Sequence, residues 1–253
     1  MSPAETPYSS YAAIYDRSGQ SRFGLRMLLY ARRLWGGEWP RSVLDLGCGT
    51  GAVAVALSLR DVRAVGVDRS PEMLARARAR AARWGARAEF VQADYRDFAL
   101  EDRFEAVTCF YDAINYCHTP FDLERVFRQA HRHARTGGTL FFDAITHFGI
   151  KHAWGTQTDA RVESDVVRVW KSTFEPATGC GRLDITYLLR DEVDAGLWRR
   201  FDEEHVHRGY DPVEVHAALR SAGWEPRETF VCFTEDPVTM MTYRVAYLAI
   251  KRG

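Results

Sequence analysis

The sequence of 253 residues predicts an α/β fold: a doubly wound sheet, with an antiparallel β insert after the fifth strand. From residue 42 onward, short β-rich runs alternate with helical stretches, which is the pattern of a parallel sheet with crossover helices. These runs are apolar along their length, as in strands that helices cover on both faces. After residue 144 the rhythm changes to longer segments that alternate polar and apolar residues, which indicates antiparallel strands.

The elements of the core can be placed one by one. Strands are expected at residues 42–46, 63–68, 88–93, 104–110 and 138–144, with helices at 52–59, 71–83 and 120–135. The second of these helices begins with Ser70 as its N-cap, Pro71 at the first helical position and Glu72 in the first turn. A helix at 212–222 and strands at 226–233 and 242–250 then resume the αβ pattern.

Two further segments lie outside this core. Residues 1–38 are interpreted as an N-terminal lid of two helices, and residues 39–253 as the main domain. Within that domain, residues 160–208 form the antiparallel insert or cap, with three strand-like segments separated by turn-like sequences. The sequence therefore predicts one α/β domain with a lid and an insert as additions.

Composition limits the classes of function. The chain is 46% apolar and 27% charged, which is ordinary for a soluble protein. Its 34 Lys and Arg residues balance its 34 Asp and Glu residues, and this balance argues against a nucleic-acid partner. No apolar run approaches the roughly 18 residues of a membrane-spanning helix, and the N-terminus does not resemble a secretory signal. The five cysteines form no CxxC pair, and no metal set is expected. We expect a cytoplasmic protein without a membrane or nucleic-acid partner.

The strongest motif is the segment Asp45–Gly51, which directly follows the first expected strand and precedes a helix. Gly47, Gly49 and Gly51 allow the backbone to turn tightly and to approach a ligand where a Cβ atom would collide. The loop stands at the carboxyl end of its strand, where open α/β sheets bind nucleotide-type ligands. The motif therefore predicts a ligand site at this edge of the sheet.

Spacing alone leaves two kinds of ligand open for this loop. Gly47, Gly49 and Ala52 also satisfy the dinucleotide fingerprint, as in a nicotinamide-dependent oxidoreductase. A dinucleotide would place its pyrophosphate at the helix N-terminus, where Asp45 would repel it. S-adenosylmethionine has no phosphate but carries a sulfonium and an ammonium, which an acidic residue suits. Charge therefore favours the methyl donor over the dinucleotide.

Further acids end the next two expected strands. Asp68 stands where a carboxylate accepts hydrogen bonds from two ribose hydroxyls, and its alternative role is that of a capping or solvated acid. Asp94 is placed to accept a hydrogen bond from the adenine amino group. Because an acid ends each of three successive strands, the pattern is more specific than any one of them.

These motifs together resemble the class I S-adenosylmethionine-dependent methyltransferases, whose core is Rossmann-like. The resemblance covers about residues 41–116: VLDLGCGTG is similar to their glycine motif, GVDRSPEML to their acidic-loop motif, and FVQADYRDF to their adenine-contacting segment. FEAVTCFYDAINY resembles their fourth strand and the substrate-facing loop after it. The implied donor-binding residues are Asp45, Gly47, Cys48, Gly49, Gly51, Asp68, Arg69, Met73, Asp94, Tyr95 and Phe110.

A second, less sharp resemblance concerns the rest of the chain. Tyr15-Asp16, Phe142-Asp143 and Arg199–Phe201 before Glu204-His205 resemble bacterial small-molecule methyltransferases related to the N-methyltransferases of amino sugars and lincosamide antibiotics. In that group a lid tyrosine covers the donor, and Tyr15 is the residue that matches it. This resemblance implies a small-molecule acceptor. We expect a monomer or homodimer.

The expected reaction is methyl transfer to N or O of a small molecule, and a hydroxyl acceptor benefits from a general base. The expected catalytic residues are His147, which is the favoured base, Tyr111 and His207. The alternative for each is a structural role as a pocket or surface residue. In the strand that contains His207, the alternation places Phe201, Glu203 and His205 on the same face, towards the pocket. A non-catalytic protein that binds S-adenosylmethionine or S-adenosylhomocysteine remains an alternative.

Overall fold

The computed structural model describes residues 12, 15–16, 19–191, 194 and 196–252. Most of the first 18 residues therefore lie outside the described residues, and with them much of the expected lid. Within 19–38 one helix is present, α1 (Ser21–Leu34). In the described part of the chain, no helix is both long and apolar enough to cross a membrane.

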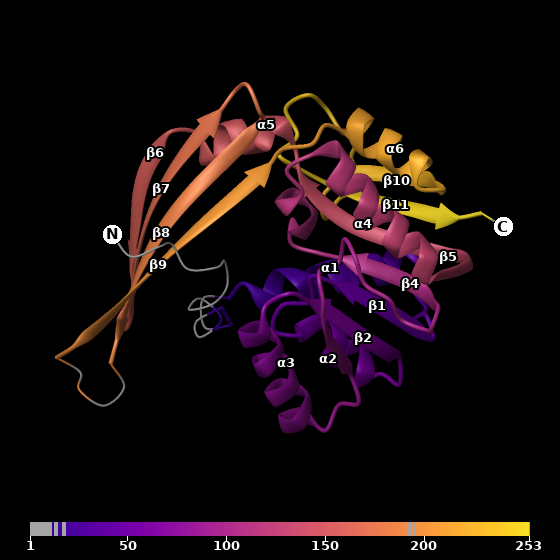
Figure 1. Ribbon diagram of the computed structural model, residues 1–253, viewed down its shortest axis with the longest axis horizontal. Coiled ribbons are helices and arrows are strands. Elements are labelled where there is room, and N and C mark those ends of the chain that lie inside the picture. The colour runs from indigo at the N-terminus through magenta and orange to yellow at the C-terminus, as the bar shows by residue number, and fades with distance from the viewer. Residues whose placement is uncertain (1–11, 13–14, 17–18, 192–193, 195, 253) are drawn as a thin grey trace.

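The core is a seven-stranded sheet in the order β10-β11-β5-β4-β1-β2-β3 (Figure 1). The first five strands pair in parallel, and β11 is antiparallel to both β5 and β10. The chain leaves β1 in one direction across the sheet and returns to β4 on its other side, which confirms the doubly wound core. The strands are β1 (Ser42–Leu46), β2 (Arg63–Asp68), β3 (Glu89–Gln92), β4 (Phe104–Cys109), β5 (Ala134–Ile145), β10 (Trp224–Val231) and β11 (Arg244–Lys251).

Helices cover both faces of this sheet. Buried side chains of α1 and α2 pack on one face and those of α4 and α6 on the other, so the strands between them are apolar on both sides. Ser70 caps α3 as expected, since its hydroxyl accepts a hydrogen bond from the Met73 amide at 3.1 Å. The helices are α2 (Ala52–Ser58), α3 (Pro71–Trp84), α4 (Pro120–His133) and α6 (Pro212–Ser221).

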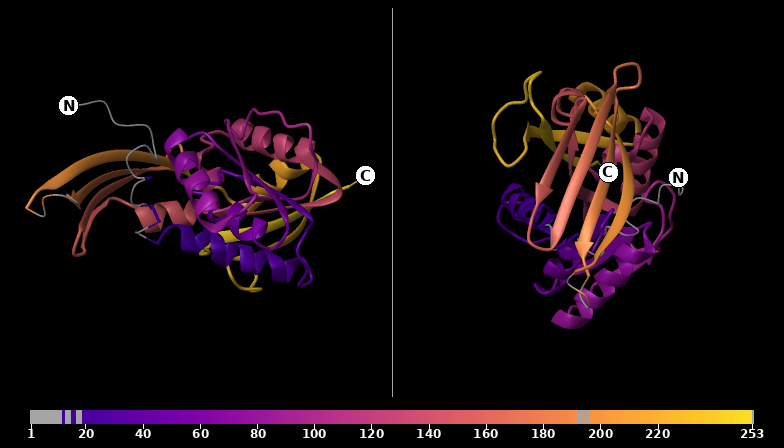
Figure 2. Two further views of the ribbon diagram at one scale, coloured as in Figure 1. Left: turned by 90° about the horizontal axis from the view of Figure 1, so that it is seen from below. Right: turned by 90° about the vertical axis from the view of Figure 1, so that its left-hand side faces the viewer.

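The insert is a separate antiparallel sheet in the order β6-β7-β8-β9. Figures 1 and 2 show it leaving the core near α5 and curving out beyond the end of the seven-stranded sheet. It begins three residues earlier than expected and has an additional strand, β6, whose residues are all exposed and therefore lack an alternating apolar pattern. Its elements and the turn before it are α5 (His147–Gly149), η3 (Ile150–Trp154), β6 (Gln157–Val162), β7 (Val166–Glu175), β8 (Cys180–Arg190) and β9 (Trp198–Arg208).

Two buried side chains join the sheets beside the short helix η2 (Ala113–Tyr116). The Asn115 amide nitrogen donates to the carbonyls of Ile145, at the end of β5, and Arg208, at the end of β9, at 2.9 and 2.7 Å. The Tyr210 hydroxyl donates to the Cys117 carbonyl at 2.7 Å. These contacts fix the insert relative to the segment that follows β4.

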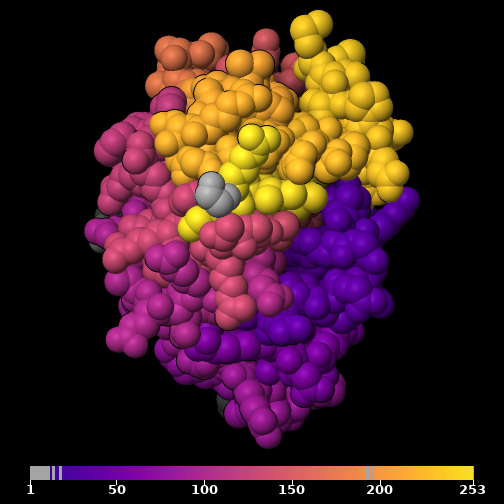
Figure 3. Space-filling view, turned by 90° about the vertical axis from the view of Figure 1, so that its right-hand side faces the viewer, coloured from indigo at the N-terminus to yellow at the C-terminus, as the bar shows by residue number. Residues whose placement is uncertain are grey.

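The loop that connects β10 to β11 packs against α1. Figure 3 shows the C-terminal part of the chain beside the N-terminal helix. Arg33 of α1 and Glu235 form an ion pair at 2.6 Å, and the Tyr30 hydroxyl donates to the Thr234 carbonyl. This loop lies at the carboxyl edge of the parallel strands, because the start of β11 pairs with the end of β5.

Candidate functional site

A cavity lies at the carboxyl edge of the parallel strands. It encloses about 710 Å³ of space, part of it open to solvent, which is the size of a small-molecule site. The loops after β1, β2, β3 and β4 all contribute to it, as expected for the ligand site of an open α/β sheet. Its lining residues are Tyr15, Gly47, Gly49, Asp68, Arg69, Met73, Asp94, Tyr95, Arg96, Phe110, Tyr111, Ala113 and Tyr116.

Most residues expected to bind the donor therefore lie around one cavity. Asp45 and Cys48 line a smaller cavity beside it, which shares Tyr15, Gly47 and Tyr111 with the first. Gly51 lines neither of the two. The sequence brings twelve expected residues to this edge, but it does not separate those that face the space from those that support it.

Glycine is needed at two positions of the loop after β1, for a different physical reason at each. At Gly49, φ is +55° and a Cβ atom would meet nothing within 4 Å, so open space lies against the backbone. At Gly51, φ is +71° and a Cβ atom would lie 2.8 Å from Phe90 and Ala77. Gly51 thus allows the loop to pack on α3 and β3, and the expectation that all three glycines approach the ligand needs this correction.

Asp68, at the end of β2, braces the glycine loop. Its carboxylate accepts hydrogen bonds from the Gly49 amide at 2.8 Å and the Ser70 amide at 2.9 Å. Burial raises the pKa of this carboxyl above its usual value, although both amide hydrogen bonds oppose the rise. Since the carboxylate also lines the cavity, it is placed to accept hydrogen bonds from a ligand.

Asp45 is a buried acid between β1 and β4. The Thr108 hydroxyl donates to its carboxylate at 2.7 Å. Burial raises the pKa of Asp45 to about 7, and the nearby charge of Asp68 adds to the rise. A cation that enters the adjoining cavity would favour the ionised form of Asp45.

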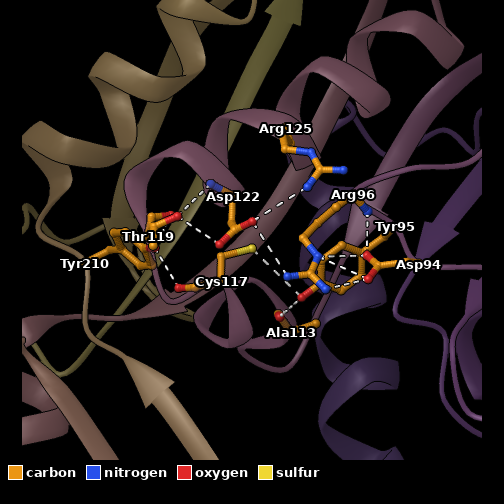
Figure 4. Close-up of polar contacts among 9 residues, drawn as sticks. All are labelled: Asp94, Tyr95, Arg96, Ala113, Cys117, Thr119, Asp122, Arg125 and Tyr210. Carbon is orange, nitrogen blue, oxygen red and sulfur yellow. Dashed lines mark hydrogen bonds and ion pairs between the residues drawn. The ribbon is translucent and has the colours of Figure 1, made fainter.

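Asp94 is already engaged by a residue that the sequence did not single out. Figure 4 shows the Arg96 guanidinium against the Asp94 carboxylate, with Nε 3.0 and 3.1 Å from its two oxygens. Burial opposes ionisation of Asp94, but the hydrogen bonds from Arg96 outweigh it and lower its pKa. A ligand amino group would share Asp94 with Arg96. Beside them, the Tyr95 hydroxyl donates to the Ala113 carbonyl at 2.8 Å and ties this loop to η2.

The loop after β4 has a strained backbone. Tyr111 and Asp112 have φ values of +61° and +50°, in the left-handed region that few non-glycine residues occupy. The Asp143 carboxylate holds both residues by accepting from their amides at 2.7 and 3.0 Å. Arg244 of β11 forms ion pairs with Asp143 and, at 2.7 Å, with Asp112. Sequence reasoning missed Arg244 because it lies far along the chain and only strand pairing brings it here.

The described part of the expected lid is anchored to the glycine loop and to α3. The Thr50 hydroxyl donates to Asp16 at 2.8 Å, and Arg80 forms an ion pair with Asp16 at 2.5 Å. Tyr15, the preceding residue, lines both cavities and packs against Tyr187 of the insert. This short segment therefore lies between the core and the four-stranded sheet.

The three expected catalytic residues have different surroundings. Tyr111 lines both cavities, and its hydroxyl donates to the Gln20 side chain. His207 is buried with Nδ1 3.1 Å from Asp112, and burial lowers its pKa, which favours the neutral ring. His147 begins α5, with its ring 5.4 Å from that of Phe174, and lines neither cavity. Of the three, Tyr111 lines the cavities, whereas His207 and His147 line neither of the two.

Comparison with known proteins supports a single family. Residues 43–138 match the family model of a methyltransferase domain. A putative methyltransferase of Geobacillus sp. (strain WCH70) is 26% identical over 96% of this chain and 99% of its own length. An S-adenosylmethionine-dependent methyltransferase structure from Clostridium acetobutylicum superposes with a TM-score of 0.85 at 24% identity, covering 98% of this chain and 100% of that one. Residues 43–138 belong to the methyltransferase-domain family, and the chain is an S-adenosylmethionine-dependent methyltransferase.

The cavity described above suits the methyl donor. The open space at Gly49 and the carboxylate of Asp68 suit a ligand that carries hydroxyl groups, and S-adenosylmethionine supplies the activated methyl group when bound. The matches to methyltransferases remove the nicotinamide-dependent oxidoreductase as an alternative. A further relative is named dTDP-3-amino-3,4,6-trideoxy-alpha-D-glucopyranose N,N-dimethyltransferase, from Streptomyces venezuelae, and is 27% identical over 72% of this chain and 74% of its own length.

Proposed function

We propose that this methyltransferase transfers the methyl group to a nitrogen atom of a small molecule. The observation that carries the small-molecule acceptor is a third cavity, which Trp154, Trp170 and Tyr187 line, and the choice of nitrogen follows the relative named as an amino-sugar N,N-dimethyltransferase. Gln20 lines this cavity and accepts the hydrogen bond of Tyr111, so a single side-chain contact separates the two spaces. Aromatic walls with a few polar groups suit a small organic acceptor.

The donor-binding roles expected from the sequence are part of this proposal. Asp68 accepts from the ribose hydroxyls, Asp94 from the adenine amino group, and Asp45 with the glycine loop faces the methionine end. Tyr15 covers the donor. The walls of the donor site are formed by Tyr95, Phe110, Met73, Arg69 and Cys48. The location of these residues around two adjoining cavities supports the assignment.

The chemistry requires little of the protein beyond position. The acceptor nitrogen forms a bond to the methyl carbon while the carbon–sulfur bond breaks and its electron pair stays on sulfur. The protein contributes by aligning the two molecules and excluding water. An amine attacks only in its neutral form, so a group that removes its proton accelerates the reaction.

Three wider features remain proposals. The acceptor is a small molecule rather than a nucleic acid, in keeping with the balanced charge of the chain. Residues 1–38 act as a lid over the domain of residues 39–253, with the insert as its cap, and the enzyme acts in the cytoplasm. We propose a monomer or homodimer.

The test measures transfer of labelled methyl groups to a nucleotide-linked amino sugar, the dTDP-3-amino sugar named for the Streptomyces relative. We expect transfer to the amine and none to the matching nucleotide sugar with a hydroxyl in place of the amine. The Asp68→Asn variant serves as the donor-site control, because losing charged hydrogen bonds should weaken S-adenosylhomocysteine binding at least about tenfold. Transfer to the hydroxyl sugar alone would show an O-methyltransferase, and donor binding without transfer to any amine probe would contradict the proposal.

A further inference from the structure

Strand β9 presents a row of buried polar side chains to the segment after β4. Glu203, His205 and His207 alternate with more exposed residues and are between 2% and 5% exposed. This is the face that the sequence predicts to lie toward the pocket. Burying a carboxylate and two imidazoles is costly unless they are paired. A row of this kind therefore needs a reason beyond packing.

The first pair on this strand points to Tyr116. Glu203 Oε2 lies 3.2 Å from His205 Nε2, and His205 Nδ1 lies 2.7 Å from the Tyr116 hydroxyl. Tyr116 in turn lines the donor cavity, and the Arg69 guanidinium carbon from the loop after β2 lies 5.8 Å from its ring centre. A continuous line of polar atoms thus runs from the buried carboxylate to the site.

A second pair, His207 and Asp112, fixes the ring of Tyr116. His207 contacts it edge-on, with ring centres 4.2 Å apart, and Asp112 lies 3.1 Å from His207. Asp112 is itself fixed by Arg244 at 2.7 Å. The phenol is therefore fixed at its ring by one histidine and at its hydroxyl by the other.

A purely structural role in attaching β9 to the segment after β4 does not explain this arrangement. Asn115 and Tyr210 already connect β9 to the same segment through backbone carbonyls. Apolar residues of similar volume in place of a buried ion pair are often as stable or more stable. The direction of the line, from Glu203 through His205 to a phenol on the cavity wall, suits the movement of a proton.

On the basis of the proposed function, we propose that Tyr116 is the catalytic residue that takes a proton from the acceptor, with His205 and Glu203 as positioning residues behind it. The acceptor would then be an amine that arrives as its ammonium ion. The ammonium gives a proton to the Tyr116 oxygen while the phenolic proton moves to His205 Nδ1. The Glu203 carboxylate stabilises the resulting imidazolium. The freed nitrogen lone pair then attacks the methyl carbon.

The test compares Tyr116→Phe with the unchanged enzyme on the nucleotide-linked amino sugar. The phenylalanine retains the ring that His207 contacts and removes only the hydroxyl. We expect kcat to fall by about a hundredfold, the scale of a lost acid–base group, while the affinity for S-adenosylhomocysteine is unchanged. His205→Gln and Glu203→Gln should lower kcat less, again without a change in donor affinity.

The matched control is His118→Ala. His118 is exposed and its Nε2 contacts the Val206 carbonyl at 2.9 Å, so this variant removes a tie between the same segment and β9 outside the line. Its kcat should be unchanged. A Tyr116→Phe variant that is folded and turns over at the normal rate would overturn the inference while leaving the proposed function intact.

A spectroscopic measurement tests the proton transfer from Tyr116 to His205 even if no probe is methylated. Nitrogen NMR of the S-adenosylhomocysteine complex should show His205 neutral, with its proton on Nε2 toward Glu203 and its Nδ1 accepting from Tyr116. Tyr116→Phe should shift the Nδ1 signal. A proton on Nδ1 of His205, or a signal that Tyr116→Phe does not move, would overturn the relay.

Discussion

Two glycines in the loop after β1 are needed for different physical reasons. Both Gly49 and Gly51 have a positive φ, so an alanine at either position adds backbone strain of about 1–2 kcal/mol. Only at Gly51 would the added methyl group also collide, with Phe90 and Ala77 at 2.8 Å. Stability and donor binding should therefore respond differently at the two positions.

We expect Gly51→Ala to lower the free energy of unfolding by about 2–5 kcal/mol, since overpacking costs roughly 1–3 kcal/mol beyond the strain. Gly49→Ala should lower it by the strain alone and weaken S-adenosylhomocysteine binding, because its methyl group enters open space at the cavity. Denaturant unfolding and calorimetry measure the two effects. Equal stability losses at both positions would contradict the packing role of Gly51.

Among the elements, the insert depends on the short helix η2 for its attachment to the core. The Asn115 side chain makes three hydrogen bonds there, with the carbonyls of Ile145 and Arg208 and with the Ile145 amide at 3.0 Å. Asn115 is completely buried, so alanine in its place leaves these backbone groups without partners. The ends of β5 and β9 would lose their common anchor.

Asn115→Ala should lower the free energy of unfolding by roughly 2–4 kcal/mol, at about 1 kcal/mol or more for each buried hydrogen bond. Hydrogen exchange should rise at the ends of β5 and β9 before it rises in β1. Gln157→Ala is the control, because this exposed amide makes a single hydrogen bond to the Ala153 carbonyl. A variant as stable as the unchanged protein would show that other contacts fix the insert.

On the scale of the whole molecule, the formal net charge is zero, with 34 basic and 34 acidic residues. Non-specific binding to nucleic acids depends on Lys and Arg that neutralise phosphates. We therefore expect no binding of a short labelled RNA at physiological ionic strength, measured by fluorescence anisotropy, while S-adenosylhomocysteine binds in the same buffer. Micromolar RNA affinity that falls steeply with added salt would contradict the proposal of a small-molecule acceptor.

The core could be predicted from local sequence because its signals are local. Apolar runs of strand length, the N-cap at Ser70 and the acids that end β1 and β2 each depend on residues close in the chain. Parallel strands then bring their carboxyl ends to one edge without further information. The strand β6 escaped prediction because its residues are all exposed, and exposure imposes no pattern.

Tertiary structure alone decided which polar residues meet. Arg244 reaches Asp112 and Asp143 only because β11 pairs with β5, and Arg96 competes for Asp94 through a loop conformation. The sequence favoured His147 as the base, but the structure does not place His147 at the cavity, because its position depends on how the insert leaves the core. By itself the sequence determined the core sheet, the identity of the methyl donor and the strand ends that we propose to bind it. The contacts between distant elements, which no local pattern encodes, determined the surroundings of the proposed acceptor site.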